Sequence, residues 1–301
     1  MGNRASETKE QGTRDNEPAS PRSTLYAFFQ LARPINGVIA SVSVVLGAFL
    51  AKGSISPPVN VAIIAIAAFL LLSAGNALND FYDVEADRIN KPARPIPSGR
   101  VKRRSALAFA VALFTVGTGL GLFVNWAAFS IACIVSVFLV LYTLTLRRLL
   151  LVGNLVIGIL TGLTFVSGGV AVGAIGGSVI PAAFAFLFTT AREVIKDIQD
   201  VRGDGMSGLT SLAVKWGQRQ AMYVSFVFLA LVILSSPLPY LLNVYSIYYL
   251  ICVVLGVDLV LVYCMLALLS SLTEKSAARV ASLMKFDIFV GLGAIYLGGI
   301  H

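Results

Sequence analysis

Residues 76–100 read NALNDFYDVEADRINKPARPIPSGR, and they place a dense group of charges directly after an apolar run. The apolar run covers residues 59–78 and is followed by Asp80, Asp83 and Asp87. On a helix these positions share one face, because they are spaced by three and four residues. Carboxylates one turn apart repel by roughly 3 kcal/mol at an effective dielectric constant near 20. The stretch therefore predicts a cation between the carboxylates at the end of an apolar helix.

The same spacing returns 117 residues later, in residues 191–204, AREVIKDIQDVRGD. Asp197, Asp200 and Asp204 again lie three and seven residues apart, and they close a second apolar run at 179–190. One acidic cluster at a helix end is often only a solvated cap. Two clusters with matched spacing indicate one shared site. Since all the ligands are oxygens, we expect a hard cation such as Mg²⁺, which typically binds one or two carboxylates together with substrate phosphates.

The composition is that of a membrane protein. The chain of 301 residues is 57% hydrophobic and 13% charged, with a mean hydropathy of +0.85. We therefore expect an all-α membrane protein with nine transmembrane helices in one bundle around a central cavity. Residues 1–24 form a polar, disordered tail in this interpretation, and 25–301 form the nine-helix domain. The nine apolar segments are 28–51, 59–80, 105–124, 126–146, 149–172, 178–197, 220–236, 243–270 and 281–300.

The basic residues predict the topology. Except for Lys52, the 23 Lys and Arg residues lie in 1–33 or around every second connection between the segments. By the positive-inside rule the N-terminus is then cytoplasmic, the C-terminus is outside, and both acidic motifs face the cytoplasm. The expected location is the cell membrane, as a multi-pass protein whose active site opens to the cytoplasm. The net charge of +8 needs no nucleic-acid partner, since topology and anionic lipids account for it.

Histidine and cysteine exclude other chemistry. The single histidine is the last residue, His301, so a histidine base or a histidine-ligated metal is excluded. Cys133, Cys252 and Cys264 lie in apolar segments without metal-ligand spacing and are expected to be buried, inert thiols. Asp258 lies deep in the eighth segment, where a structural contact and a role in a cavity both remain open, and the role of Asp287 is also open.

The pattern indicates a diphosphate-binding site, because it combines carboxylates, a divalent metal and basic residues at one end of a helical bundle. A diphosphate on an apolar chain would place its head there and its tail between the helices. Metal and Lys or Arg neutralise the charge on a departing diphosphate, and dry helix walls protect an allylic cation from water. An ion-coupled transporter would instead place its carboxylates near the bilayer midplane on interrupted helices. A non-catalytic lipid-binding protein would have no use for two matched metal motifs.

Asn79, Asp80, Asp83 and Asp87 resemble the Asn-Asp-x-x-Asp-x-x-x-Asp signature of the UbiA-type intramembrane prenyltransferases. Asp200 and Asp204, with Asp197 one turn earlier, resemble the second aspartate motif of that family. The resemblance implies two Mg²⁺ that bridge the motifs through a prenyl diphosphate. Asp83, Asp87, Asp200 and Asp204 would be catalytic metal ligands. Asp80, Asp197 and the catalytic Asn79 would lie in the same cluster, either as further metal ligands or as partners that hold the ligands. The implied diphosphate-binding residues are Lys91, Arg94, Lys196, Tyr142 and Arg147.

Three stretches, 90–100, 151–155 and 192–200, are most similar to archaeal digeranylgeranylglyceryl phosphate synthases within that family. This similarity implies transfer of geranylgeranyl from its diphosphate to the hydroxyl of geranylgeranylglyceryl phosphate, in ether-lipid synthesis. The first stretch also resembles chlorophyll synthases, so an aromatic or porphyrin acceptor remains the alternative. A phosphorylated acceptor needs a second anion subsite. The candidates are Arg33 and Asn36 for the acceptor, with Arg147 and Arg148 as further cations near the same mouth.

Overall fold

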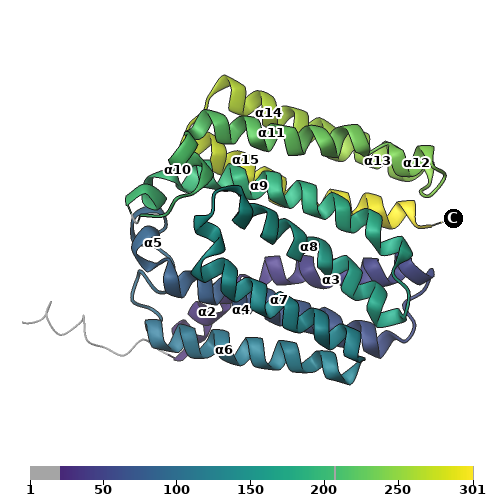
Figure 1. Cartoon of the computed structure of the whole chain (residues 1–301), viewed down its shortest axis with the longest axis horizontal. Helices are drawn as coiled ribbons and strands as arrows, with labels where there is room; N and C mark the ends of the chain where they lie inside the picture. The colour runs from purple at the N-terminus through teal and green to yellow at the C-terminus, as the bar shows by residue number, and fades with distance from the viewer. Residues whose placement is uncertain (1–20, 207, 301) are drawn as a thin grey trace, which may run out of the picture.

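The computed structural model describes residues 21–206 and 208–300, and the regular structure in those ranges is helical. Nine helical segments there are long and apolar enough to cross a membrane, as the sequence predicts. They lie side by side in one bundle (Figure 1). The spans are α3 (Pro34–Lys52), α4 (Pro58–Tyr82), α6 (Arg103–Leu120) with η1 (Gly121–Phe123), α7 (Trp126–Leu144), α8 (Leu151–Val172), η3 (Gly176–Ser178) with α9 (Val179–Met206), α11 (Gln218–Ser235) with α12 (Leu238–Leu241), α13 (Ile247–Cys252) with the π-helical η4 (Val253–Asp258) and α14 (Leu259–Ser270), and α15 (Glu274–Gly298).

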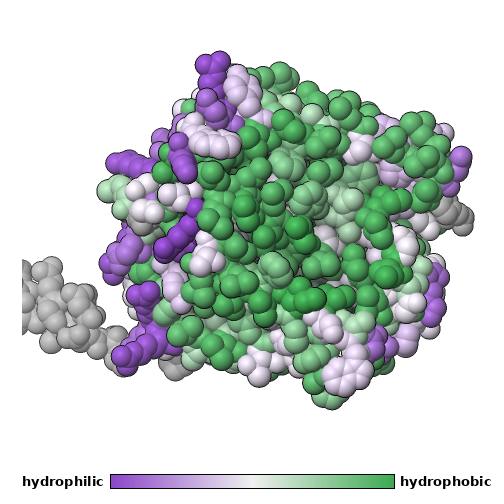
Figure 2. All heavy atoms as spheres, viewed as in Figure 1, coloured by the Kyte–Doolittle hydropathy of each residue, from purple (hydrophilic) through white to green (hydrophobic). Residues whose placement is uncertain are grey.

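Four short elements flank the spans at the end of the bundle that carries the acidic motifs, and Figure 1 shows α5 and α10 at that end. This end is strongly hydrophilic, whereas a broad apolar surface covers the middle of the molecule (Figure 2). An apolar belt of this kind is what a bilayer requires of a helical bundle. The short elements are α2 (Pro21–Ala32), α5 (Val84–Asn90), η2 (Leu146–Arg148) and α10 (Leu212–Trp216).

The first predicted segment, 28–51, is divided in the structure. Helix α2 ends at Ala32, Arg33 adopts a left-handed conformation with φ of 51°, and α3 starts at Pro34. Proline lacks the N–H that would continue the preceding helix, and it disfavours helical geometry in the residue before it. The break turns the Arg33 side chain toward α4. The polar tail predicted for 1–24 lies outside the described residues as far as residue 20, and α2 begins at Pro21.

The last helix begins earlier than the predicted segment 281–300. Helix α15 starts at Glu274, because the Thr273 hydroxyl accepts a hydrogen bond from the Ser276 backbone N–H at 3.1 Å. A threonine cap of this kind satisfies one of the free N–H groups of the first turn. The negative charge of Glu274 in that turn also stabilises the helix, because it lies near the positive end of the helix dipole. The extra turns make α15 long enough to reach the polar end of the bundle.

Glycines, among them the GxxxG pair Gly158 and Gly162, allow α8 to pack closely against two neighbours. A Cβ atom at Gly162 would lie 2.7 Å from the Ala182 carbonyl oxygen of α9. On another face of α8, a Cβ atom at Gly168 would collide with the backbone of α3. Helix α8 is therefore held between α3 and α9, and its position fixes the wall that separates the cavities described below.

Candidate active site

The first acidic motif lies at a joint between two helices. Helix α4 ends at Tyr82 and α5 begins at Val84, with Asp83 between them at φ −89° and ψ 10°. Asp80 and Asp87 still share a face across this joint, since Arg94 binds both carboxylates, whereas Asp83 pairs with Arg147. Asp83 and Asp87 line a polar cavity, whereas Asp80 is buried beside it and does not line it.

Asn90 joins the two acidic motifs. Its amide nitrogen donates to the Asp200 carbonyl oxygen at 3.1 Å, and its amide oxygen accepts from the Gly203 backbone N–H at 3.1 Å. Gly203 is required at this contact, since a Cβ atom there would collide with the Asn90 amide group. These contacts dock α5 onto α9 and bring motifs that are far apart in sequence to one cavity.

The polar cavity encloses about 790 Å³ of empty space. It gathers both motifs and most of the predicted basic residues, in line with the sequence analysis. Of the candidate site residues, Asp80, Asn36 and Arg148 do not line it. Its lining includes Arg33, Asn79, Asp83, Asp87, Asn90, Lys91, Arg94, Tyr142, Arg147, Glu193, Lys196, Asp197, Asp200, Asp204 and Ser211.

Arginine side chains occupy the space between the carboxylates of the first motif. Arg94 donates to Asp80 at 3.0 Å and to Asp87 at 2.5 Å, and Arg33 forms a further ion pair with Asp80. The cation that the spacing predicts between Asp80 and Asp87 is thus a guanidinium group here. Burial raises the pKa of Asp87 above its ordinary value, although Arg94 acts against this. Burial tends to lower the pKa of Arg94, but Asp80 and Asp87 outweigh it and the net pKa is raised.

The remaining acidic groups also have partners. Lys91 pairs with Asp200 at 2.5 Å, and Arg147 pairs with Asp83. Asn154 donates to Asp197 at 3.2 Å. Each of these contacts joins different helices or loops, so together they fix the positions of the elements that line the cavity.

Several residues of the site carry no strong signal in the sequence. Ser211 lines the cavity but belongs to no motif that the sequence analysis uses, and Asn90 lies in the stretch 90–100 without being singled out as a site residue. Glu193 also lines it and binds Lys196 at 2.6 Å, an i,i+3 pair that a helical reading of 191–204 could have found. Thr143 donates to the amide oxygen of Asn79 from α7, and only the fold reveals that contact.

Two apolar cavities lie between the spans and share Ile39, Ser43 and Thr161 in their linings. One, between α3, α4, α7 and α8, encloses about 850 Å³ and includes Asn36. It also includes Leu139, whose carbonyl accepts from the Thr143 hydroxyl at 3.0 Å. Thr143 in turn binds Asn79. This cavity, which we call the α4–α7 cavity, therefore lies next to the polar site.

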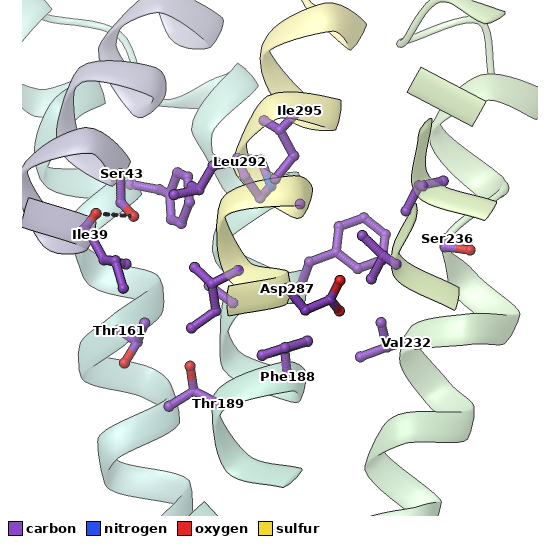
Figure 3. A pocket seen from close by; sticks show the side chains of 18 of the residues that line it. Ile39, Ser43, Thr161, Phe188, Thr189, Val232, Ser236, Asp287, Leu292 and Ile295 are labelled. Atoms are coloured by element: carbon purple, nitrogen blue, oxygen red, sulfur yellow. Dashed lines mark hydrogen bonds between the residues drawn. The ribbon is translucent and has the colours of Figure 1, made fainter. Parts of the chain in front are cut away.

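The other apolar cavity is bounded mainly by α3, α8, α9, α11, α13 and α15, and we call it the α9–α15 cavity. It encloses about 730 Å³ of empty space. Figure 3 shows Asp287 among largely apolar neighbours there. Within the described residues, neither carboxylate oxygen of Asp287 has a hydrogen-bond partner. Asp258 differs, since its Oδ2 accepts from Ser236 at 2.7 Å, which is a structural contact.

The three cysteines are free, with Cys264 buried and Cys133 and Cys252 partly buried.

The donor set of the polar cavity suits a hard divalent ion. Its candidate ligands are the carboxylates of Asp83, Asp87, Asp197, Asp200 and Asp204 and the amide oxygen of Asn79. In the parts of the chain that the structure describes, no three acidic, histidine or cysteine residues converge tightly enough to hold a metal by themselves. Mg²⁺ does not need such a cage, because it is usually bound by one or two carboxylates with substrate phosphates and water. The residues therefore fit Mg²⁺ that is bound together with a diphosphate.

Comparison with known proteins identifies relatives across most of the chain. The model of the UbiA prenyltransferase family matches residues 40–289. A digeranylgeranylglyceryl phosphate synthase of Natronomonas pharaonis is 44% identical over 226 residues, which are 75% of this chain and 81% of that protein. The synthase of that name from Thermococcus gammatolerans is 36% identical over 276 residues, 92% of this chain and 99% of that protein. A solved structure described as that of digeranylgeranylglyceryl phosphate synthase in membranes has a TM-score of 0.69 at 34% identity, and covers 92% of this chain and 99% of its own.

Proposed function

The chain belongs to the UbiA prenyltransferase family and is a prenyltransferase, and we propose that it transfers geranylgeranyl from its diphosphate to the hydroxyl of geranylgeranylglyceryl phosphate. The product would be an archaeal membrane ether lipid. The identity of 32–44% to several digeranylgeranylglyceryl phosphate synthases over most of the chain supports these substrates. Membership of an enzyme family sets aside the transporter and the non-catalytic lipid-binding protein.

One observation carries the proposal most strongly: a polar cavity with both aspartate motifs lies next to the apolar α4–α7 cavity, which shares three lining residues with a second apolar cavity. A reaction between two lipid substrates needs one polar centre for the heads and separate space for the two chains. The α4–α7 cavity lies next to Asn79, so it suits the chain of the donor. The side on which the polar cavity opens is the cytoplasm in this proposal, as the distribution of basic residues predicts.

Asp83, Asp87, Asp200 and Asp204 would hold two Mg²⁺ ions. Asp197 and Asn79 would lie beside these four aspartates. Bound Mg²⁺ supplies charge neutralisation to the diphosphate as it leaves. Lys91, Arg94, Arg147 and Lys196 donate to phosphate oxygens, with Tyr142 on the same wall. Asp80 takes a different part in this arrangement, because its contacts are with Arg33 and Arg94, and it orients those two cations.

The bond between C1 of the geranylgeranyl group and the diphosphate oxygen breaks, and the electron pair leaves with the diphosphate. The allylic cation that remains lies against apolar helix walls, which exclude water as a competing nucleophile. The glycerol hydroxyl then forms the new C–O bond, and its proton passes to a carboxylate, the released diphosphate or water. A poor nucleophile suffices because the cation forms first, which agrees with a site that has no histidine.

The test is a competition with purified protein. Labelled geranylgeranyl diphosphate is offered together with geranylgeranylglyceryl phosphate, 4-hydroxybenzoate, dihydroxynaphthoate and chlorophyllide, in the presence of Mg²⁺. We expect the label in the glycerol ether. Preferential transfer to an aromatic or porphyrin acceptor would keep the family and remove the lipid-synthase assignment.

The four proposed metal ligands provide a second test. We expect Asp83→Ala, Asp87→Ala, Asp200→Ala and Asp204→Ala to abolish turnover, because each removes a ligand that the diphosphate complex requires, and EDTA to inhibit the wild type. Circular dichroism and gel filtration of the variants establish that they fold. Near wild-type rates in two of these variants at saturating Mg²⁺, or activity that survives EDTA, would disprove the assignment.

A further inference from the structure

Lys285 of α15 lies one turn beyond Ala281, whose carbonyl oxygen accepts a hydrogen bond from Arg192 of α9. The charged groups that act on Lys285, among the described residues, are Arg192, Arg33 and Lys196, and all three are cations. It lies eleven residues after the start of α15 at Glu274, about 16 Å along the helix at 1.5 Å per residue. It is partly buried, in contrast to the exposed Lys275 and Arg279 in the first turns of the same helix. A cation that is partly buried among cations indicates a place where an anion belongs.

Contacts between α9 and α15 fix this group of cations. Arg192 of α9 donates from Nε to the Ala281 carbonyl oxygen at 3.1 Å, one turn before Lys285. Lys196 follows Arg192 by one turn of α9. Glu193 is the carboxylate that serves both, at 2.6 Å from Lys196 and 3.4 Å from Arg192. Arg192 and Lys196 thus share Glu193 as their ion-pair partner, Arg33 is paired with Asp80, and Lys285 forms no ion pair within the described residues.

The cluster lies between the polar cavity and the α9–α15 cavity. Glu193 and Lys196 line the polar cavity. On α9, Phe188 and Thr189 line the α9–α15 cavity one turn away from Arg192, on the side facing the bundle interior. On α15, Ile288 lines the same cavity, one turn beyond Lys285. Figure 3 shows Phe188, Thr189 and Leu292 converging on this space from the two helices. A lipid with its anionic head on the cations would therefore have its chain in the α9–α15 cavity.

We propose that Lys285, with Arg192 and Lys196, binds the phosphate of a phosphomonoester lipid acceptor, whose isoprenoid chain occupies the α9–α15 cavity. The proposal rests on the function proposed above and adds a second anion subsite to it, which shares Lys196 with the donor diphosphate and otherwise uses Lys285 and Arg192. Two anionic heads then meet at the polar cavity from opposite sides. The donor chain lies in the α4–α7 cavity and the acceptor chain in the α9–α15 cavity.

This subsite differs from the one that the sequence suggests. Arg33 and Arg147 are the sequence candidates for an extra anion, but they form ion pairs with Asp80 and Asp83. Asn36 lines the α4–α7 cavity and not the polar cavity. Lys285 is 80 residues beyond the second acidic motif, so the sequence gives no reason to connect the two.

The test compares the wild type with Lys285→Gln and with the control Arg279→Gln, which removes an exposed cation from the same helix. Initial rates are measured with geranylgeranylglyceryl phosphate and with geranylgeranylglycerol, which lacks the phosphate. In Lys285→Gln we expect KM for the phosphorylated acceptor to rise about ten- to a hundredfold, because the variant loses one hydrogen bond to a charged phosphate oxygen. KM for geranylgeranyl diphosphate should stay unchanged in Lys285→Gln. In Arg279→Gln, the KM values for the acceptor and for the donor should both stay unchanged. The wild-type preference for the phosphorylated acceptor should shrink by the same factor as KM rises.

A binding measurement separates this proposal from the proposed function. Geranylgeranylglyceryl phosphate is titrated, without donor, into each protein in nanodiscs of neutral lipid and again in nanodiscs that contain anionic lipid. Weaker binding to Lys285→Gln in both is the expected result. Equal binding to wild type and Lys285→Gln, with normal transfer by both, would overturn the subsite and leave the function intact. An effect that appears only with anionic lipid would assign Lys285 to bulk lipid headgroups instead. A wild type that neither binds nor prenylates this acceptor would refute the proposed function itself.

Discussion

The contact of Asn90 with α9 is the most direct test of how the two acidic motifs are brought together. Asn90→Ala removes two hydrogen bonds, those to the Asp200 carbonyl and from the Gly203 N–H. At about 0.5–1.5 kcal/mol each, they contribute roughly 1–3 kcal/mol. If all of this free energy holds α5 in its catalytic position, kcat/KM falls about 5- to 150-fold. The concentration of Mg²⁺ needed for half-maximal rate should rise as well, because Asp83 and Asp87 flank the joint that α5 forms.

Gly203→Ala gives the matching perturbation from the other helix. Its new Cβ would collide with the Asn90 amide group, and overpacking of this kind costs about 1–3 kcal/mol. In the Asn90→Ala background the amide group is absent, so the added methyl group has room. We therefore expect Gly203→Ala to be harmful alone and nearly neutral in the double variant, with a coupling energy of about 0.5–3 kcal/mol.

The assay is transfer of labelled geranylgeranyl in detergent or nanodiscs, with Mg²⁺ titrated for each variant and thermal unfolding measured in parallel. Asn60→Ala is the control, since Asn60 also donates across helices, to the Ala171 carbonyl at 3.5 Å, but lies at the start of α4, far from the site. Wild-type activity in Asn90→Ala would refute the reasoning. So would a penalty from Gly203→Ala that is the same in both backgrounds.

Two further predictions concern stability and topology. Asp287→Leu should raise the midpoint of thermal unfolding, because it removes a carboxylate without hydrogen-bond partners from a span, where a charge costs about 2.5–3.5 kcal/mol on insertion scales; an unchanged or lower midpoint would show that Asp287 has a stabilising partner. In a cysteine-free background, Ser98→Cys should react with an impermeant thiol reagent only from the cytoplasmic side and Ser54→Cys only from outside. Both serines are exposed, and labelling of both from the same side would contradict the topology.

The sequence predicts the fold well because its signals are local. Apolar runs of membrane length give nine spans in the described residues, and glycine spacing on α8 gives its close packing against α9. The two acidic motifs are also local patterns, and their spacing predicts that they share a site. The sequence does not reveal the joint at Asp83, where α4 ends and α5 begins. It also does not reveal how α5 docks onto α9, because that contact uses Asn90, whose partner lies 110 residues away.

Cations are harder to assign from sequence than acidic motifs, because their roles depend on partners that only the fold supplies. Arg94, Arg147 and Lys285 look alike in the sequence, as basic residues at one end of apolar segments. The fold gives Arg94 two carboxylates and Arg147 one, whereas the charges around Lys285 are all positive. In the proposed function Arg94 and Arg147 exchange a carboxylate partner for the donor diphosphate, whereas Lys285 beside an apolar cavity needs no such exchange to bind an anionic lipid head. The positive-inside rule places all three residues on one side of the membrane, and tertiary structure decides which anion each of them meets.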